Sequence, residues 1–434
     1  MYSIMLNPLA QELNTILDSS VAGALLSDAG RRIFFPKGII AQGAEAKKFA
    51  SYANATIGTT VVNGIPVILP CIQDCAPTFS APELVAYAPT AGNPELRKIW
   101  KEKLELKNSL LKGKHITTPI VVAGLTAGIA NIAELFLGQN EHLLVADPSW
   151  DNYSLIIETR YNSELHRFNM FKDDGFDIEN FEKAVKKEAE SGFVRILLNF
   201  PQNPSGYSPT AEEAVKIVAI LKDVAEKGAK VLAISDDAYF GLNYEDNIEK
   251  QSLFAHLCNL HENILAVKID GPTKEDFVWG FRCGFITFGW KGATDEQYTA
   301  IEKKLTGVIR ATVSCCSTPA QSMILRAFTD PAIEYQKSHF RKILENRYLK
   351  VRAFVNSHKS DVIRPLPFNS GYFMSFRLNK INAETLRTEL LNQKGIGTIS
   401  IDSSTLRIAF SSLDEDKIEN VYSAIYEIAE KLAE

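Results

Sequence analysis

The sequence predicts an α/β fold, in which a large domain with a mostly parallel sheet is joined to a smaller α+β domain. From about residue 118 to residue 289, apolar runs bounded by turns alternate with helical patterns. This alternation is typical of parallel strands covered by helices on both faces of the sheet. Beyond residue 290 the pattern changes to long helices followed by short strands, which favours a separate α+β unit.

The expected strands and helices can be placed along the chain from these patterns. Strands are expected at the apolar runs TPIVVAG, HLLVADP, FVRILLNFP, AKVLAISDD, NILAVKID and CGFITFG, and in the C-terminal part at YFMSFRL, GIGTIS and TLRIAF. Helices are expected at 127–137, 210–228, 294–312, 318–356 and near 413–433. The helix at 210–228 begins at a threonine with an acidic residue three positions later, which is a capping-box pattern.

Length and composition exclude several classes of protein. With 434 residues, 46% of them hydrophobic, the chain is too long for one simple core, which supports two domains or one large domain with a satellite. Its formal net charge of −5 lacks the basic excess of a nucleic-acid-binding protein. No apolar run reaches the roughly 18 residues of a membrane span, and the N-terminus does not resemble a signal peptide. We therefore expect a cytoplasmic protein with no nucleic-acid or membrane partner.

The cysteines and histidines give no sign of a disulfide framework or a metal site. Six cysteines are sparse for this length and lie mostly in apolar segments, so reduced thiols are expected. Cys71 and Cys75 have no partner pair of similar spacing, and the seven histidines form no HExxH-type pair. From the sequence, no bound metal is expected.

Polar, aromatic and turn-forming residues follow five of the expected strands. In doubly wound sheets, ligands bind beyond the carboxyl ends of the strands, so these residues are expected to lie at one edge of the sheet. They are, in chain order, Gly124-Leu125-Thr126-Ala127-Gly128, Pro148-Ser149-Trp150, the segment from Pro201 to Gly206 with Asn203, Asp236-Asp237-Ala238-Tyr239, and Gly271-Pro272-Thr273-Lys274. Packing alone does not readily explain reactive or aromatic groups at five strand ends.

Two of these segments suit a phosphate and a ring. The turn at 124–128 can present backbone N–H groups at the start of a helix, together with the Thr126 hydroxyl, which favours an anion such as phosphate. Trp150 can offer a flat face to a ring. Taken singly, an ordinary glycine-rich turn and a core tryptophan explain these residues at least as well.

Three charged residues complete the pattern. Asp236 ends a strand in an apolar setting, where a buried carboxylate needs a cation such as a protonated ring nitrogen, although a helix N-cap or a salt bridge would also serve. Lys274 and Arg282 are eight residues apart (282 − 274 = 8), and only the lysine can lose its proton when desolvated. This favours a nucleophilic amine beside a permanent phosphate clamp. Pyridoxal 5′-phosphate (PLP) matches the set, because it carries a phosphate, a ring nitrogen and an aldehyde that forms a Schiff base with lysine.

From about residue 55 to the C-terminus, the sequence resembles the fold-type I PLP-dependent enzymes, and most closely the aspartate aminotransferase-like family of class I and II. The segment TKEDFVWGFRCG resembles the family's lysine motif, in which an arginine follows the lysine by eight residues. Seven further segments resemble family motifs: ATIG, YAPTAGNPELR, GLTAG, DPSWDNY, NPSG, DDAY and LRIAF. The resemblance implies a large domain at 76–315 with a seven-stranded sheet, a small domain at 316–434, and an N-terminal segment at 1–75 that contributes to the small domain and covers the active site.

The resemblance also implies a role for each matched residue. Lys274 would hold PLP as a Schiff base and carry the α-proton of the substrate, and Asp236 would pair with the ring nitrogen. The other ring and phosphate contacts would come from Tyr239, Asn203, Trp150, Thr126, Ala127, Thr273 and Arg282, and from Tyr87 of a neighbouring subunit. The substrate would be bound by Arg407, which clamps the α-carboxylate, and by Asn203, Trp150 and Gly58, the last in a mobile segment over the substrate.

The segment GVIRATVS bears on the choice of substrate. The resemblance places Arg310 where aspartate-type enzymes carry an arginine that pairs with the distal carboxylate of the substrate from across the dimer. Bidentate pairing with a carboxylate suits an arginine at this place. An exposed helix arginine is an equally open interpretation.

The implied function is that of a PLP-dependent aminotransferase, which moves an amino group between an L-amino acid and a 2-oxo acid in a homodimer with shared active sites. Aspartate or glutamate is the favoured donor because of Arg310. An aromatic amino acid aminotransferase, and a PLP-dependent lyase or decarboxylase on the same fold, stay open as alternatives. A non-enzymatic PLP-binding regulator is disfavoured, because the N-terminus has no basic helix-turn-helix pattern.

Several residues depart from the family pattern and mark a divergent member. Gly271 replaces a frequent phosphate-binding serine, and Tyr153 replaces a histidine that often backs the ring-binding aspartate. Pro272, Phe277 and Cys283 are unusual within the lysine motif.

Overall fold

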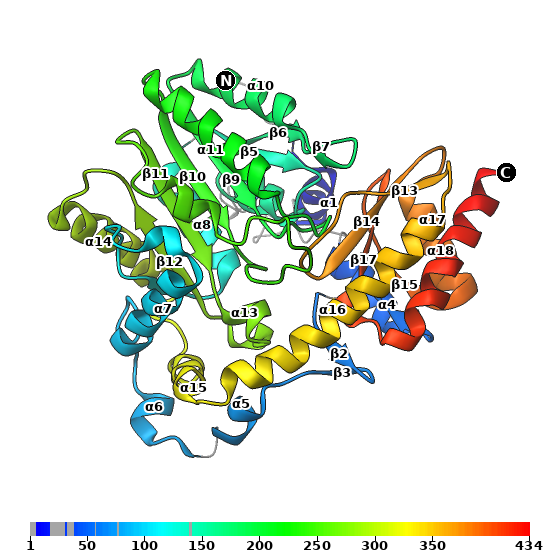
Figure 1. The fold of residues 1–434 in the computed structure, drawn as a ribbon, viewed down its shortest axis with the longest axis horizontal. Helices are drawn as coiled ribbons and strands as arrows, with labels where there is room; N and C mark the ends of the chain where they lie inside the picture. The colour runs from blue at the N-terminus through cyan, green and yellow to red at the C-terminus, as the bar shows by residue number, and fades with distance from the viewer. Residues whose placement is uncertain (1–5, 18–30, 33–38, 57, 76–77, 139–140) are drawn as a thin grey trace.

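A seven-stranded sheet forms the centre of the larger unit (Figure 1), in the order β4-β12-β11-β10-β9-β5-β6. The computed structural model describes residues 6–17, 31–32, 39–56, 58–75, 78–138 and 141–434. The strands of this sheet are β4 Ile120–Val122, β5 His142–Asp147, β6 Glu164–Asn169, β9 Phe193–Asn199, β10 Lys230–Asp236, β11 Ile264–Asp270 and β12 Gly284–Gly289. Only β12 runs antiparallel to its neighbours, which confirms the predicted mostly parallel sheet.

The strands are buried on both faces of this sheet, as their continuous apolar runs predict. On β9, Val194, Ile196 and Leu198 belong to one apolar cluster, whereas the intervening Leu197 belongs to another. Because successive side chains of a strand point to opposite faces, each cluster marks one face of the sheet. The turns that leave the carboxyl ends of these strands are therefore held by a core on each side.

Helices cover both faces of the sheet. On one face lie α10 Ile178–Ala189, α11 Ala211–Glu226 and α12 Leu253–Leu257, and on the other lie α8 Leu125–Phe136 and α14 Asp295–Thr312. Helix α11 begins with the predicted capping box, in which Thr210 accepts from the Glu213 backbone N–H and the Glu213 side chain accepts from the Thr210 N–H. Short elements between them are α9 Asn152–Ser154, η3 Leu155–Arg160, β7 Phe171–Lys172, β8 Gly175–Phe176, α13 Pro272–Glu275 and η4 Trp279–Phe281.

The C-terminal part forms a smaller α+β unit around a four-stranded antiparallel sheet, in the order β13-β14-β17-β16. Its strands are β13 Ile363–Pro365, β14 Phe373–Leu378, β16 Ile399–Asp402 and β17 Thr405–Ala409. Its helices are α16 Ile333–Ser357, α17 Ala383–Lys394 and α18 Ile418–Ala433, with the short η5 Phe410–Ser412 and η6 Glu415–Lys417. In Figure 1, α16 runs from the larger unit to this sheet.

The described N-terminal residues contact both units. Strand β1 Ala53–Asn54 pairs in parallel with β15 Ile396–Gly397 of the smaller unit. The other early elements are α1 Pro8–Leu17, α4 Ile39–Phe49, β2 Val61–Val62, β3 Ile65–Pro66, α5 Pro70–Cys75, α6 Ala81–Val85, α7 Pro94–Lys107 and η2 Ser109–Leu111. No helix in the described part of the chain is both long and apolar enough to cross a membrane.

Two expected helices differ in extent from those observed. The pattern at 318–356 is divided into α15 Thr318–Thr329 and α16, because Pro331 lies between them and cannot continue a helical ladder. The last helix begins at Ile418 rather than near 413. Helix α15 packs against α5, α6 and α7. The division of the chain at residues 75 and 315 stays a prediction.

Candidate active site

The predicted residues at the strand ends converge on one cavity of about 230 Å³. It lies where β4, β5, β9, β10 and β11 end, as expected for the carboxyl edge of a doubly wound sheet. The predicted residues that line it are Thr126, Trp150, Asn203, Asp236, Tyr239, Thr273, Lys274 and Arg282. Leu125, Ile129, Tyr153, Asn199 and Ala238 complete the lining.

Asp236 is a buried carboxylate with one oxygen paired and one free. Its Oδ2 accepts a hydrogen bond of 2.5 Å from the Tyr153 hydroxyl, whereas its Oδ1 is buried without a partner among the described residues. Burial raises the pKa of Asp236 to about 6, although the Tyr153 hydrogen bond and the Lys274 amine oppose this rise. An orphaned carboxylate oxygen of this kind costs free energy unless a cation or a donor meets it.

Tyr153, at a position where the resemblance leads one to expect a histidine, contacts the aspartate through its hydroxyl. Removing the hydroxyl in Tyr153→Phe is expected to weaken PLP binding by roughly 10- to 100-fold, since a hydrogen bond to a charged group contributes about 1.5–3 kcal/mol. Because this bond lowers the pKa of Asp236, its loss is also expected to move the acid limit of PLP binding to higher pH. A fluorescence titration of apoenzyme with PLP between pH 5 and 8 measures both effects.

The control is Tyr161→Phe. Tyr161 lies eight residues after Tyr153 (161 − 153 = 8), and its hydroxyl is bonded to Glu134 rather than to Asp236. An unchanged affinity and pH profile in Tyr153→Phe would show that this hydroxyl does not support Asp236.

Lys274 lies in α13, directly after β11, and points over the Tyr239 ring, with Nζ 4.8 Å from its centroid. Burial is the main cause that lowers the pKa of the Lys274 amine to about 8; the Asp236 carboxylate opposes this shift and the Arg282 guanidinium adds to it. The Tyr372 hydroxyl donates to the Lys274 carbonyl at 2.7 Å and fixes the turn that carries the amine. With this pKa, roughly a tenth of the amine is unprotonated at pH 7, far more than for an ordinary lysine, which suits a nucleophile or a general base.

The start of α8 and Arg282 form a cationic end of the cavity. The first backbone N–H groups of α8, which include those of Thr126 and Ala127, have no carbonyl partner within the helix. Gly124 precedes them with φ 84°, and a Cβ at this position would lie 2.7 Å from Nη2 of Arg282. The glycine therefore both adopts the left-handed backbone and leaves room for the guanidinium. The Thr273 hydroxyl is buried and has no hydrogen-bond partner among the residues that the structure describes.

Gly271 has a structural cause that the sequence does not reveal. A Cβ at Gly271 would lie 2.9 Å from Cα of Gly284 and 3.0 Å from the Cys283 carbonyl oxygen. Strand β12 thus passes too close for the serine that the resemblance leads one to expect at this position.

Arg407 enters from the smaller unit and is buried beside the cavity. It lies on β17 and donates from Nη1 to the Asn203 side-chain oxygen at 3.0 Å and from Nη2 to the Thr56 carbonyl at 2.8 Å. Burial lowers its pKa to about 10, and its Nε is buried with no partner in the described part of the chain. The guanidinium also lies 4.3 Å from the centroid of the Phe373 ring.

Gly58 lies close to the same group, since a Cβ there would meet Phe373 Cζ at 2.7 Å and the Tyr239 hydroxyl at 3.6 Å. Ala127, Gly58 and Arg407 do not line this cavity themselves, and neither do Tyr87 and Arg310 within one chain. Tyr87 is 92% exposed, and Arg310 is exposed in the last turn of α14, where it donates to the Ser314 hydroxyl at 2.5 Å. Their expected roles require a second subunit.

The structure adds residues that the sequence analysis did not single out. Asn199, the last residue of β9, donates to the Asp236 carbonyl at 2.7 Å and accepts from the Asn203 backbone N–H at 2.8 Å. Its position near the end of a predicted strand could have indicated that it lies at the carboxyl edge of the sheet. Phe373 and Tyr372 come from the smaller unit and touch Tyr239. No pattern in the sequence indicates that they reach this site.

The residues present fit PLP. The free Asp236 oxygen suits a protonated ring nitrogen, and the free Thr273 hydroxyl, the first turn of α8 and Arg282 suit a phosphate. The Lys274 amine lies between these two ends and is deprotonated readily enough to meet an aldehyde. The geometry therefore accommodates a ring with an acidic nitrogen partner at one end and an anion at the other.

Comparison with known proteins agrees with this fit. Residues 65–425 match the family model described as aminotransferase class I and II. The chain is similar to a probable aspartate/prephenate aminotransferase of Aquifex aeolicus, with 24% identity over 349 residues, which cover 77% of this chain and 81% of that protein. Among solved structures, an aminotransferase from Anaerococcus prevotii matches with a TM-score of 0.82 and 22% identity, covering 94% of this chain and 100% of the other. A Pyrococcus horikoshii kynurenine aminotransferase in complex with PMP matches with a TM-score of 0.77 and 16% identity, covering 95% and 98%.

Proposed function

Because the chain belongs to the aminotransferase class I and II family, it is a PLP-dependent aminotransferase, and we propose that it acts on a dicarboxylic pair. The donor would be L-aspartate or L-glutamate and the acceptor a 2-oxo acid. The observation that carries the site assignment is the meeting of Lys274 and Asp236 in one cavity, with Arg407 bonded to the lining residue Asn203, although the three charged residues come from distant segments.

When bound, PLP supplies an aldehyde that condenses with amines and a ring that withdraws electrons from the substrate's α-carbon. Lys274 is proposed to take the α-proton on Nζ and to return it, for which a pKa of about 8 is well placed. Asp236 is proposed to keep a proton on the ring nitrogen, with Tyr153 holding its other oxygen. Tyr239 and Asn203 are proposed to donate hydrogen bonds to the ring oxygen, and Trp150 to cover the ring face.

The phosphate is proposed to bind at the cationic end of the cavity, to the residues of α8 (Thr126 and Ala127), Thr273 and Arg282. Arg407 is proposed to bind the α-carboxylate of the substrate. No described residue pairs with its Nε, and the Asn203 oxygen already orients the Nη1 side of the guanidinium. Gly58 is proposed to lie over the substrate. This is supported by its closeness to Phe373 and to the hydroxyl of Tyr239, which lines the cavity.

The dicarboxylic donor is supported by Arg310 and by the name of the Aquifex aeolicus relative, an aspartate/prephenate aminotransferase. Arg310 does not reach the cavity of its own chain, so its proposed role is in the site of a second subunit. The same holds for Tyr87. Val85 and Tyr87 are 82% and 92% exposed, so both side chains are available for contact with a second subunit. We therefore propose a homodimer with shared active sites.

The variant Arg310→Ala is expected to lower kcat/KM for aspartate by about 30-fold or more, since loss of one partner of a desolvated ion pair costs at least about 2 kcal/mol. Activity with phenylalanine, which has no distal carboxylate, is expected to change much less. Arg364→Ala is a matched control, because Arg364 is an exposed arginine that pairs with Asp174 on another face. Equal losses for both donors would contradict the assignment of Arg310.

Mixed dimers test the shared site. In a mixture of Arg310→Ala and Lys274→Ala protomers, a heterodimer would contain one site with an intact lysine from one chain and an intact arginine from the other. Aspartate activity is expected to reappear on mixing, and the holoenzyme is expected to sediment as a dimer. A monomer in sedimentation, or no recovery, would contradict the proposed assembly.

A donor-by-acceptor panel tests the reaction itself. Amino acid consumption is expected to require a 2-oxo acid acceptor and to release neither ammonia nor CO₂ in proportion. Acceptor-independent release of either product would instead assign the site to the lyase or decarboxylase class.

A further inference from the structure

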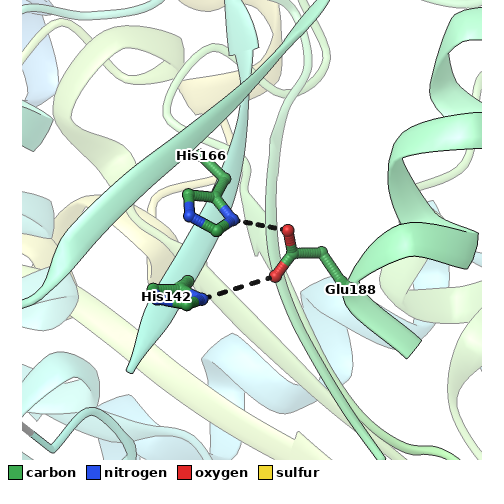
Figure 2. A group of neighbouring side chains, drawn as sticks. All are labelled: His142, His166 and Glu188. Atoms are coloured by element: carbon green, nitrogen blue, oxygen red, sulfur yellow. Dashed lines mark hydrogen bonds and ion pairs between the residues drawn. The ribbon is translucent and has the colours of Figure 1, made fainter. Parts of the chain in front are cut away.

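Two histidines and a glutamate meet near the amino ends of β5 and β6, whereas the cavity lies beyond the carboxyl ends of the strands. Figure 2 shows the three side chains. His142 begins β5, His166 lies on β6, and Glu188 lies in the last turn of α10. One ligand atom from each residue lies within 4.8 Å of the others. In Figure 2 both rings face the Glu188 carboxylate, which is directed at them from the helix.

The contacts are those of a cluster, not of a single salt bridge. Nδ1 of His166 lies 2.5 Å from Oε1 of Glu188, and Nδ1 of His142 lies 4.0 Å from Oε2 of the same carboxylate. The two rings stack, with centroids 4.0 Å apart and planes 28° from parallel. A second carboxylate, Glu164, has Oε2 3.6 Å from Nε2 of both rings.

The atoms of this cluster are of the kinds that bind a divalent transition metal. A neutral imidazole offers one nitrogen lone pair, and a carboxylate is only an acceptor. Nδ1 of His166 is bonded to Glu188, whereas Nδ1 of His142 lies 4.0 Å from Glu188 and both Nε2 atoms lie 3.6 Å from Glu164, beyond hydrogen-bond distance. A divalent cation can use these imidazole lone pairs together with the carboxylates.

We propose that His142, His166 and Glu188 bind one divalent transition-metal ion of the Zn²⁺ type, with Glu164 or water completing the coordination. Two imidazole nitrogens and a carboxylate oxygen favour borderline ions such as Zn²⁺, Co²⁺ or Ni²⁺ over Mg²⁺ and Ca²⁺, which prefer oxygen alone. Bond lengths of about 2.0–2.2 Å place neighbouring ligand atoms roughly 3–3.5 Å apart, so the His166 and Glu188 atoms, now at 2.5 Å, must separate and the more distant donor must move closer. The histidine side chains are 39% and 33% exposed, so they have room to move and the ion has a path of entry.

The expected role of this site is structural. β5 runs from His142 toward Asp147 and the cavity, and five residues of strand (147 − 142 = 5) span about 16 Å. The ion would tie β6, the edge strand of the sheet, to β5 and to the end of α10. The nearby carboxylate of Glu141 forms an ion pair with Arg195 and is already engaged.

Zinc binding to the untagged holoenzyme tests the proposal. After removal of metal by a chelator, titration with ZnCl₂ in a calorimeter is expected to give one ion per chain and a higher Tm. His142→Ala, His166→Ala and the near-isosteric Glu188→Gln are each expected to weaken binding by at least about tenfold, the lower end of what outer-sphere changes already cost. They are also expected to abolish the rise in Tm.

The matched control is His339→Ala, an exposed histidine on α16, which is expected to leave zinc binding unchanged. Retained PLP absorbance and far-UV circular dichroism show that each variant is folded. The proposal is overturned if the wild-type protein takes up no stoichiometric zinc, or if the His142→Ala/His166→Ala double variant binds it as tightly as the wild type. Binding to the buried cysteines, or to PLP, would produce the second result.

Discussion

Lys274→Ala is expected to lower kcat/KM for amino transfer by more than about 10⁴-fold, because in the proposed site this one side chain supplies both the covalent anchor of PLP and the proton carrier. No other amine of the described residues lines the cavity, so no neighbour can replace it. The rate at which the 2-oxo acid product forms from the amino donor measures this loss of activity. The absorbance of lysine-bound PLP is expected to disappear with it.

Two controls separate chemistry from charge. Lys274→Arg keeps the cation near Asp236 but cannot lose its proton, so it is expected to be as inactive as the alanine variant. Lys291→Ala, at an exposed turn after β12, is expected to be fully active. A normal rate in Lys274→Ala would remove the basis of the proposed site.

Lys337→Met is expected to lower the free energy of unfolding by about 3–5 kcal/mol at pH 7, the cost of removing one partner from a buried ion pair. Lys337 lies on α16, is 2% exposed, and pairs with Asp276 at 2.8 Å and with Glu275 at 3.7 Å. These two carboxylates directly follow Lys274. Glu275 has a second cationic partner, Lys107 of α7, whose Nζ lies 2.6 Å from the Glu275 carboxylate. The network therefore anchors the turn that carries the proposed catalytic amine.

Urea unfolding of Lys337→Met and of Lys342→Met makes the comparison within one helix. Lys342 pairs with Glu345, but both side chains are well exposed, so its replacement is expected to change stability by no more than about 1 kcal/mol. Similar stabilities for the two variants would contradict the argument from burial.

Acid unfolding gives an independent readout of the same network. Burial acts to raise the pKa of Glu275, but Lys107 and Lys337 outweigh it and hold this pKa at about 2. A carboxyl with a lowered pKa contributes stability above its unfolded value, near 4.5, and this contribution is lost as the pH falls toward 2. Without Lys337 the native pKa rises, so the variant is expected to begin unfolding at a higher pH than the wild type.

Much of the fold could be predicted from local pattern. The strands of the large sheet are continuous apolar runs, and the turns that follow them carry the polar residues of the cavity. Thr126, Asn203, Asp236 and Lys274 were found in this way, because parallel strands bring their carboxyl ends to one edge whatever the packing around them. Helix α11 was predicted from its capping box for the same reason: the signal is contained in a few adjacent residues.

Contacts between distant segments could not be predicted in this way. The hydroxyl that meets Asp236 comes from Tyr153, 83 residues earlier, and the oxygen that orients Arg407 comes from Asn203, 204 residues earlier. Periodicity assigns a residue to a face of its own element, but it does not say which element packs against that face. The division of 318–356 into two helices has a local cause. The helical periodicity continues across Pro331, but this proline interrupts the hydrogen-bond ladder of the helix.

The sequence by itself determined the α/β class, the family and the set of residues at the strand ends, because each depends on short segments whose chemistry does not change with their surroundings. Only the tertiary structure decided which charges are buried. Lys337 looks in the sequence like any helix lysine, and His142 and His166, 24 residues apart (166 − 142 = 24), match no ligand spacing. Burial and proximity set the free energy of a charge, and both arise only when the sheet and its helices are packed together.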